Sequence, residues 1–316
     1  MKARFTGHDT FPLRYGWLFK AINFIENNGM LSVSDADQTS TAISQLGVGK
    51  NMVGAIKYWA ESASLARTVI QDRVHRQEVQ SIGRSLFSKL SGVDPYLEDI
   101  GTIWLVHFLL NFDDEQLTAY RYFFNYSNSI YFDKTKFVSD LFEDAVRLTG
   151  NDSFKVATVK KDVDCFLATY TSKSHSSVKK LAAVDEDHFS SPLSELRLIN
   201  DLGRGFYQCD LDDRPSLPLN IFIYSLVEFF KLVNKDSKVN QVSFEDILSR
   251  PLSPGKIFKL SEAGLGRLLD EAVSEYGRHI SWVDSLGLKQ VTIDDDLLVH
   301  SVDLLDEYYG GGKWNL

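Results

Sequence analysis

Residues 36–62 read ADQTSTAISQLGVGKNMVGAIKYWAES, and this stretch decides the expected fold of the N-terminal part. Apolar residues recur every three or four positions on both sides of Gly47-Val48-Gly49, which indicates two short amphipathic helices joined by a sharp turn. Asp35 precedes the first helix and is a good N-cap residue. Two short helices with a glycine-containing turn between them are typical of a helix-turn-helix.

Two short strand-like runs, residues 68–70 and 78–80, follow the second helix. The polar turn between them contains Arg73 and Arg76. A basic hairpin at this place predicts the wing of a winged helix-turn-helix, with both arginines contacting phosphate. The alternative is a helical packing module that carries a surface hairpin.

The start of the second helix holds the residues that we expect to reach DNA. In a helix-turn-helix, the N-terminal residues of this recognition helix contact base edges and phosphates. Lys50 and Asn51 occupy those positions, and Lys57 follows two turns later. An amide such as that of Asn51 is suited to reading adenine.

The charge distribution agrees with phosphate binding by two basic segments of the chain. The chain has a net charge of −9, but residues 1–90 hold 11 Lys and Arg against 7 Asp and Glu, and residues 155–184 hold 6 against 2. Phosphate binding depends on local positive surface and not on the total charge. We therefore add Lys160 and Lys161, in the second basic block, to the predicted DNA-binding residues, although ordinary solvated faces would have the same composition.

Composition excludes several classes of protein. The chain is 44% hydrophobic and 24% charged, which is typical of a globular protein. Its first residues show no apolar run behind a basic flank, no apolar run reaches membrane length, and its two cysteines, Cys165 and Cys209, are isolated. We expect a cytoplasmic protein without a disulfide framework, a structural zinc site or membrane association.

The remaining chain predicts a mainly helical α+β protein in three parts. We expect a winged-helix DNA-binding domain over residues 1–92, a helical middle domain over 93–184 and a mixed α/β domain over 185–316. In the middle domain, apolar residues between Lys160 and Tyr170 have helical spacing. On a helix Asp162 and Asp164 diverge by about 200°, whereas on a strand they would share a face and could bind one metal ion. The hypothesis of a metal site formed by these two residues and Asp9 stays open beside the prediction of a helix.

Several segments in one order resemble a bacterial family, the SspB-like family, which is a former domain of unknown function. They are residues 7–18 (GHDTFPLRYGWL), 47–53 (GVGKNMV), 56–59 (IKYW), 94–99 (DPYLED), 101–105 (GTIWL), 162–170 (DVDCFLATY), 190–196 (SSPLSEL) and 253–260 (SPGKIFKL). The resemblance covers nearly the whole chain.

The resemblance implies a role in DNA phosphorothioation, in which sulfur replaces a non-bridging phosphate oxygen, and in antiviral defence. Family members are thought to be nicking endonucleases that cut one DNA strand. Their partners would be a cysteine desulfurase, an ATP-pyrophosphatase or reductase-like protein, and an ATPase. The resemblance supplies no catalytic residues.

Residues 7–10, Gly-His-Asp-Thr, are the strongest candidate for catalysis on chemical grounds. Nicking requires a base that activates a nucleophile and a cation that stabilises an anionic transition state. His8, Asp9 and Thr10 supply a base, a carboxylate and a hydroxyl, and Arg14 or a Mg²⁺ or Mn²⁺ ion supplies positive charge. The alternative is a turn in which Asp9 or Thr10 caps the next helix.

Three functions remain open at this point. The first is a DNA nickase, and the second is a non-catalytic winged-helix adaptor that brings the sulfur-transfer proteins to DNA. The third is a structural subunit whose acidic residues 185–316 bind the partner proteins. A homodimer is compatible with each of them.

Overall fold

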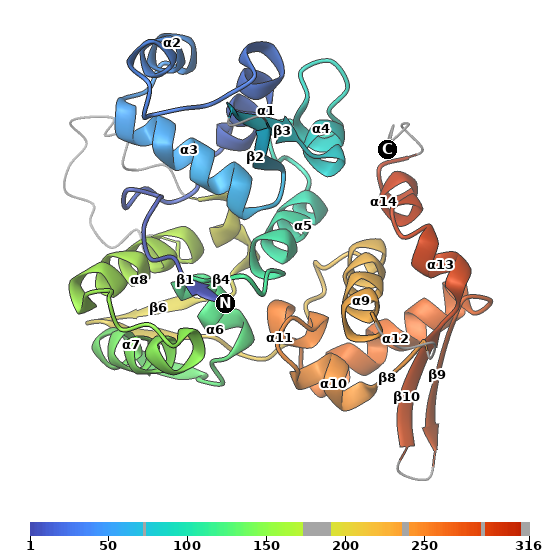
Figure 1. Cartoon of the computed structure of the whole chain (residues 1–316). Coiled ribbons are helices and arrows are strands. Elements are labelled where there is room, and N and C mark those ends of the chain that lie inside the picture. Colours follow the sequence, from blue (N-terminus) through green and yellow to red (C-terminus); the bar gives the residue numbers. More distant parts are fainter. Residues whose placement is uncertain (72–73, 173–190, 236–239, 286–287, 311–316) are drawn as a thin grey trace, which may run out of the picture.

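A computed structural model describes the chain except for residues 72–73, 173–190, 236–239, 286–287 and 311–316 (Figure 1). Helices form most of the described fold, and the described strands make four small sheets of two or three strands each. The predicted mainly helical α+β class is therefore confirmed. In the described residues, no helix is long and apolar enough to cross a membrane.

The N-terminal part has the two helices, the glycine turn and the hairpin in the predicted order. The Asp35 carboxylate accepts a hydrogen bond from the Gln38 amide at 2.8 Å, which caps the second helix of this part. Gly47 ends that helix with a φ of 65°, in the left-handed region that favours glycine. The elements are α1 (Trp17–Asn28), α2 (Ala36–Leu46), α3 (Lys50–Ser62), β2 (Ala66–Gln71), β3 (Val74–Val79) and α4 (Ser81–Phe87).

A helix that is buried on all sides forms the centre of the molecule. In α5 (Ile100–Asn111), every residue from Gly101 to Asn111 is buried. His107 on this helix donates from Nε2 to the Ile257 carbonyl at 2.9 Å and accepts at Nδ1 from the Tyr170 hydroxyl at 2.8 Å. Burial lowers the pKa of His107 to about 3, so the ring stays neutral and is a satisfied core residue.

Among the described residues, short strands, three α-helices and one 3-10 helix (η2) complete the middle of the chain. A parallel pairing of Lys2 with Gln116 and of Ala3 with Leu117 ties the N-terminus to this part. Antiparallel pairing also joins Tyr131 to Gln208, on the other side of α7 and α8 in the chain. The elements are β1 (Lys2–Ala3), β4 (Gln116–Leu117), α6 (Ala119–Asn125), β5 (Tyr131–Asp133), α7 (Lys134–Thr149), α8 (Val156–Tyr170), η2 (Pro192–Leu196), β6 (Asn200–Gly203) and β7 (Phe206–Gln208).

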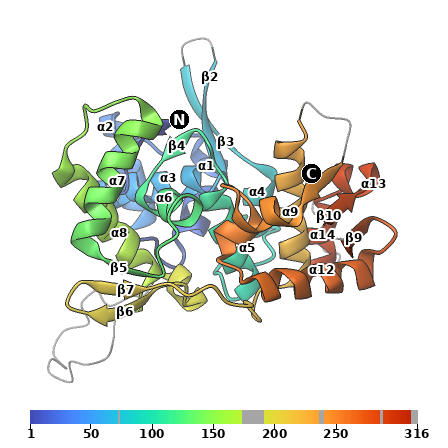
Figure 2. The same cartoon turned by 90° about the horizontal axis from the view of Figure 1, so that it is seen from below.

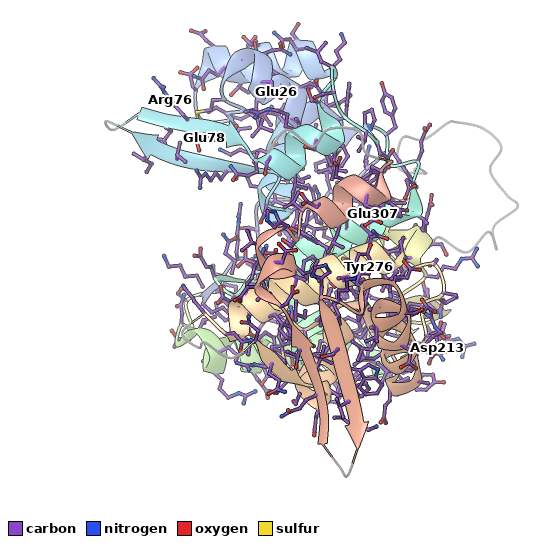
Figure 3. The ribbon with its side chains drawn as sticks, turned by 90° about the vertical axis from the view of Figure 1, so that its right-hand side faces the viewer. Glu26, Arg76, Glu78, Asp213, Tyr276 and Glu307 are labelled. Carbon is purple, nitrogen blue, oxygen red and sulfur yellow. The ribbon has the colours of Figure 1, made fainter. Side chains whose placement is uncertain are left out.

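The C-terminal part mixes helices with a three-stranded antiparallel sheet. Its hairpin of β9 (Ile280–Ser285) and β10 (Leu288–Ile293) projects from the body, as β2 and β3 do elsewhere (Figures 2 and 3). The last helix returns to the centre, where the Tyr308 hydroxyl donates to Asp99 at 2.6 Å. The other elements are α9 (Leu219–Val233), β8 (Gln241–Ser243), α10 (Phe244–Ser249), α11 (Pro254–Phe258), α12 (Glu262–Tyr276), α13 (Asp295–Val299) and α14 (Asp303–Tyr308).

Buried apolar side chains from all three predicted domains belong to one continuous cluster. It extends from Leu18 on α1 through Trp104 on α5 to Leu268 on α12. The boundaries at residues 92 and 184 stay predictions, and the second lies outside the described residues.

Arg121 on α6 fastens the N-terminal part to the centre. Its side chain is 2% exposed, and the guanidinium donates to the carbonyls of Ser62 at 3.0 Å, Leu110 at 2.9 Å and Gln116 at 3.2 Å. Asp113 lies 2.9 Å from the same group and balances its charge. A planar group with five donors can satisfy several carbonyls at once, which lysine cannot do in this geometry.

We expect Arg121→Met to lower the free energy of unfolding by about 3–5 kcal/mol, because it removes one partner of a buried ion pair and leaves acceptors unpaired. The control is Arg147→Met, since that arginine is 74% exposed beside Asp144 and should cost at most about 1 kcal/mol. Urea denaturation of the full chain measures both. Equal losses in the two variants would contradict a special role for Arg121.

Candidate functional site

The Gly7–Thr10 segment forms a turn with an unusual backbone. Gly7, Asp9 and Thr10 have φ angles of 123°, 46° and 66°. A side chain at Gly7 would lie 2.6 Å from the Tyr58 ring, so glycine is required for close packing as well as for the backbone angle. Left-handed non-glycine residues are held only where the surroundings determine them, and such positions often cluster at functional sites.

His8 holds this turn against α8. Its side chain is buried, and its Nδ1 accepts a hydrogen bond from the Thr10 amide at 3.0 Å. Since Nδ1 accepts, the proton lies on Nε2, which donates to Asp162 Oδ1 at 2.7 Å. Asp162 Oδ2 accepts from the Ala119 amide at 2.6 Å. One buried carboxylate thus joins the N-terminal turn, α6 and α8.

The four predicted catalytic residues therefore have different surroundings. His8 uses both ring nitrogens within the protein, while Asp9 and Thr10 are exposed on the same turn. The Asp9 carboxylate points toward Gly54 of α3. Arg14 is half-buried, with its guanidinium carbon 5.5 Å from the centre of the Trp17 ring.

A cavity of about 540 Å³ lies beside Gly47-Val48-Gly49, the turn that joins α2 to α3. Two cations, Arg14 and Lys20, line it, and Lys20 also donates to the Leu46 carbonyl at 2.8 Å. Gly49 gives α3 no side-chain cap, so the positive end of the helix dipole faces this region. The lining residues are Arg14, Trp17, Lys20, Ile43, Gly47, Val48, Gly49 and Met52. No sequence motif points to Lys20, which lies one helical turn from Trp17 on α1.

The predicted DNA-binding residues fall into exposed and enclosed groups. Lys50, Asn51, Arg76, Lys160 and Lys161 are exposed, on α3, β3 and α8. Across the described part of the chain, neither Lys50 nor Arg76 has an ion-pair partner.

Lys57 and Arg73 differ from that exposed group. Lys57 is half-buried, 3.9 Å from Glu61, which also accepts from Thr68 and Gln77 of the hairpin. This cluster fixes the hairpin on α3. Arg73 lies outside the described residues.

The three carboxylates predicted for a metal ion do not form one ligand set. Asp162 is occupied by His8 and the Ala119 amide, and Asp164 forms an ion pair with Lys134. No group of three His, Cys, Asp or Glu residues in the described ranges could hold a metal. Asp162 and Asp164 lie on the helix α8, which confirms the predicted helix. They do not fit joint coordination of one Mg²⁺ or Mn²⁺ ion with Asp9.

Comparisons with known proteins identify the family. A family model described as "Protein of unknown function (DUF4007)" matches residues 5–309, which is nearly the whole chain. The chain belongs to the DUF4007 family.

Solved structures confirm the expected SspB-like membership. An SspB crystal structure is similar with a TM-score of 0.83 and 27% identity, over 98% of this chain and 90% of that one. A magnesium ion-bound SspB crystal structure gives a TM-score of 0.82, with the same identity and coverage. No curated protein sequence matches the chain.

We expect His8 and Asp162 to be energetically coupled, because their side chains are buried and form a hydrogen bond with each other. In a double-mutant cycle of His8→Ala and Asp162→Ala, the two losses of unfolding free energy should be non-additive by about 1–3 kcal/mol. Denaturation curves of the two single variants and the double variant give the coupling. A cycle of His8→Ala with the exposed Asp37→Ala is the control and should be additive. Additivity in both cycles would remove the proposed link.

Proposed function

We propose that this protein binds duplex DNA as a component of a DNA phosphorothioation system and nicks one strand. The observation that carries the proposal is the exposure of four predicted DNA-binding cations, Lys50 on α3, Arg76 on β3, and Lys160 and Lys161 on α8. SspB-like membership supports the choice of system, through the role that the resemblance implies. Backbone phosphates are the partner that such unpaired surface cations favour.

We interpret α1, α2, α3 and the β2–β3 hairpin as a winged helix. The order of the elements supports this interpretation, because the hairpin directly follows the second helix of the helix-turn-helix. The hairpin projects from the body, with Arg76 on it, so it can reach past the surface (Figure 3). Lys50 and Asn51 begin α3, where a recognition helix meets the major groove.

The His8–Asp162 contact brings the second basic block to the same region. Asp162 follows Lys161 directly on α8, and its carboxylate is bonded to the N-terminal turn. The N-terminal turn of the first basic block and α8, which carries part of the second, are therefore in contact. We propose that Lys160 and Lys161 bind phosphates beside the winged helix.

The exposed turn residues supply the proposed chemistry. In hydrolysis, a base removes a proton from the attacking water, and cations stabilise the charge that develops on the phosphate. Asp9 is the accessible base, and His8 acts as a positioning residue that fixes the turn. Arg14, beside the cavity at the start of α3, is placed to bind a phosphate oxygen.

The second candidate is a non-catalytic adaptor, favoured by two observations. Both His8 nitrogens are occupied, and the three predicted metal-binding carboxylates do not converge. The adaptor would bind DNA through the same surface and the cysteine desulfurase, the ATP-pyrophosphatase or reductase-like protein, and the ATPase through the acidic residues 185–316.

We expect Arg76→Gln to weaken binding to all DNA sequences alike, because it removes one phosphate contact. The slope of log affinity against log salt concentration should become shallower by about 0.9. Arg67→Gln on the same hairpin is the matched control, since Glu78 already pairs with that arginine at 2.8 Å. Fluorescence anisotropy over a salt series measures both. The same slope change in both variants, or in neither, would exclude a specific contact by Arg76.

The plasmid assay separates the nickase from the adaptor. With Mg²⁺ or Mn²⁺ and the partner proteins present, supercoiled plasmid should relax to open circles, and Asp9→Asn should abolish this without loss of DNA binding. Asp37→Asn, an exposed carboxylate on α2, is the control and should relax plasmid normally. DNA binding without relaxation under all these conditions would favour the adaptor.

A further inference from the structure

A second cavity, of about 380 Å³, lies in another part of the molecule, between α11 and the segments around residues 127–130 and 209–211. None of its lining residues is among the predicted DNA-binding or catalytic residues. Ligand pockets have volumes of roughly 300–1,000 Å³, so this one has room for a small metabolite. The lining residues are Ser127, Asn128, Ser129, Ile130, Cys209, Leu211, Leu248, Ser249, Gly255, Lys256, Lys259, Leu260 and Glu262.

Two lysines line this cavity without a carboxylate partner. Lys259 is only 5% exposed, and its ammonium donates to the carbonyls of Phe123 at 3.0 Å and Ser127 at 3.1 Å. Lys256 donates to the side-chain oxygen of Asn128. In the described residues, neither lysine forms an ion pair. The Lys259 ammonium also lies 4.8 Å from the centre of the Phe123 ring, so its partners are neutral groups and not an anion. A buried charge is usually paired with an opposite charge, and a bound anion would supply that partner here.

Arg214 adds a third positive charge behind the cavity. It is 7% exposed and donates to the carbonyls of Phe258 at 3.0 Å and Lys259 at 3.3 Å. Its acidic neighbour, Asp212, is 3.7 Å away and largely exposed, so water weakens that attraction. Glu262, the carboxylate among the lining residues, forms an ion pair with Lys289 at 3.1 Å, so it is already engaged by another cation.

Cys209 does not supply the missing negative charge. Burial raises the pKa of its thiol, which keeps the group neutral near pH 7. Burial lowers the pKa of Lys259 to about 8, and the charges of Lys256 and Arg214 act in the same direction. Lys259 is thus mostly charged at pH 7, and a bound anion would stabilise that charge.

The rest of the cavity suits an organic body attached to the anion. Ile130, Leu211, Leu248 and Leu260 give it apolar walls. A neighbouring cavity of about 510 Å³ shares Leu248, Ser249 and Glu262 with it, so a longer ligand can continue there. Glu262 at the shared border accepts from the Lys289 ammonium at 3.1 Å through one oxygen, and its other oxygen can accept from an amino or hydroxyl group of a ligand.

We propose that this cavity binds a phosphate monoester on an organic body, of which a nucleotide is the simplest example. Lysines are common phosphate ligands, and a dianion compensates two closely placed ammonium groups. The phosphate can come from a free nucleotide or from the 5′-phosphorylated end of a DNA strand. The site does not depend on the proposed nicking activity, because no residue is shared.

Calorimetric titration of the full chain with deoxyadenosine monophosphate tests the proposal. We expect saturable binding that Lys256→Gln weakens about tenfold, the effect of losing one charge-assisted hydrogen bond. Ser129→Trp should block the cavity without changing its cations. Lys136→Gln, an exposed lysine paired with Asp140 on α7, is the control and should bind normally. Lys259 is not replaced, because it also supports the carbonyls of Phe123 and Ser127.

The probes distinguish the sources of the phosphate. Binding of the mononucleotide but not of a 5′-phosphorylated oligonucleotide indicates a free nucleotide, and preference for that oligonucleotide over its 5′-hydroxyl form indicates a strand end. Both results support the phosphate site, whereas no binding of either probe, or binding unchanged by Lys256→Gln and Ser129→Trp, overturns it. Affinity should also fall as the pH rises through about 8, where Lys259 loses its proton beside Lys256, Arg214, Cys209 and Glu262.

Discussion

The buried carboxylate of Asp162 is the constraint on which the N-terminal half depends. A carboxylate without water needs hydrogen-bond donors for its oxygens, and here they come from His8 and from the Ala119 amide. These donors belong to segments 154 and 43 residues away along the chain. Satisfying one charge therefore fixes the position of the Gly7–Thr10 turn relative to α6 and α8. Whatever chemistry the exposed Asp9 performs, its position is determined by this buried contact.

Arg121, which follows Ala119 by two residues on α6, has a complementary role. It supplies donors to carbonyls at the ends of α3 and α5, where helix geometry leaves acceptors without intrahelical partners. Asp162 supplies an acceptor to the first amide of the same short helix. One buried carboxylate and one buried guanidinium thus satisfy polar groups at the ends of α3, α5 and α6. The apolar cluster can continue through all three predicted domains because these polar groups are satisfied inside it.

The sequence predicted the parts of the fold that local rules determine. The Asp35 cap, the Gly47 turn, the second helix from Lys50 and the two following strands all depend on residues within a few positions of one another. The same is true of the helix that contains Asp162. The candidate site depends instead on which segments meet, and no spacing rule connects His8 with Asp162. The sequence therefore identified Gly7–Thr10 as a polar turn but could not tell that His8 is turned inward while Asp9 stays exposed.

The net charge of residues 185–316 also did not predict the cavity that Lys256 and Lys259 line, for a physical reason. Residues 185–316 are strongly acidic, so their composition favours a protein-docking surface over an anion pocket. The carboxylates of that part lie mostly at the surface, where water screens them, whereas Lys259 and Arg214 are buried among carbonyl oxygens. In a region of low dielectric constant, a few cations determine the local potential more than many solvated acids do. The acidic composition of residues 185–316 is therefore compatible with a cavity that binds a phosphate.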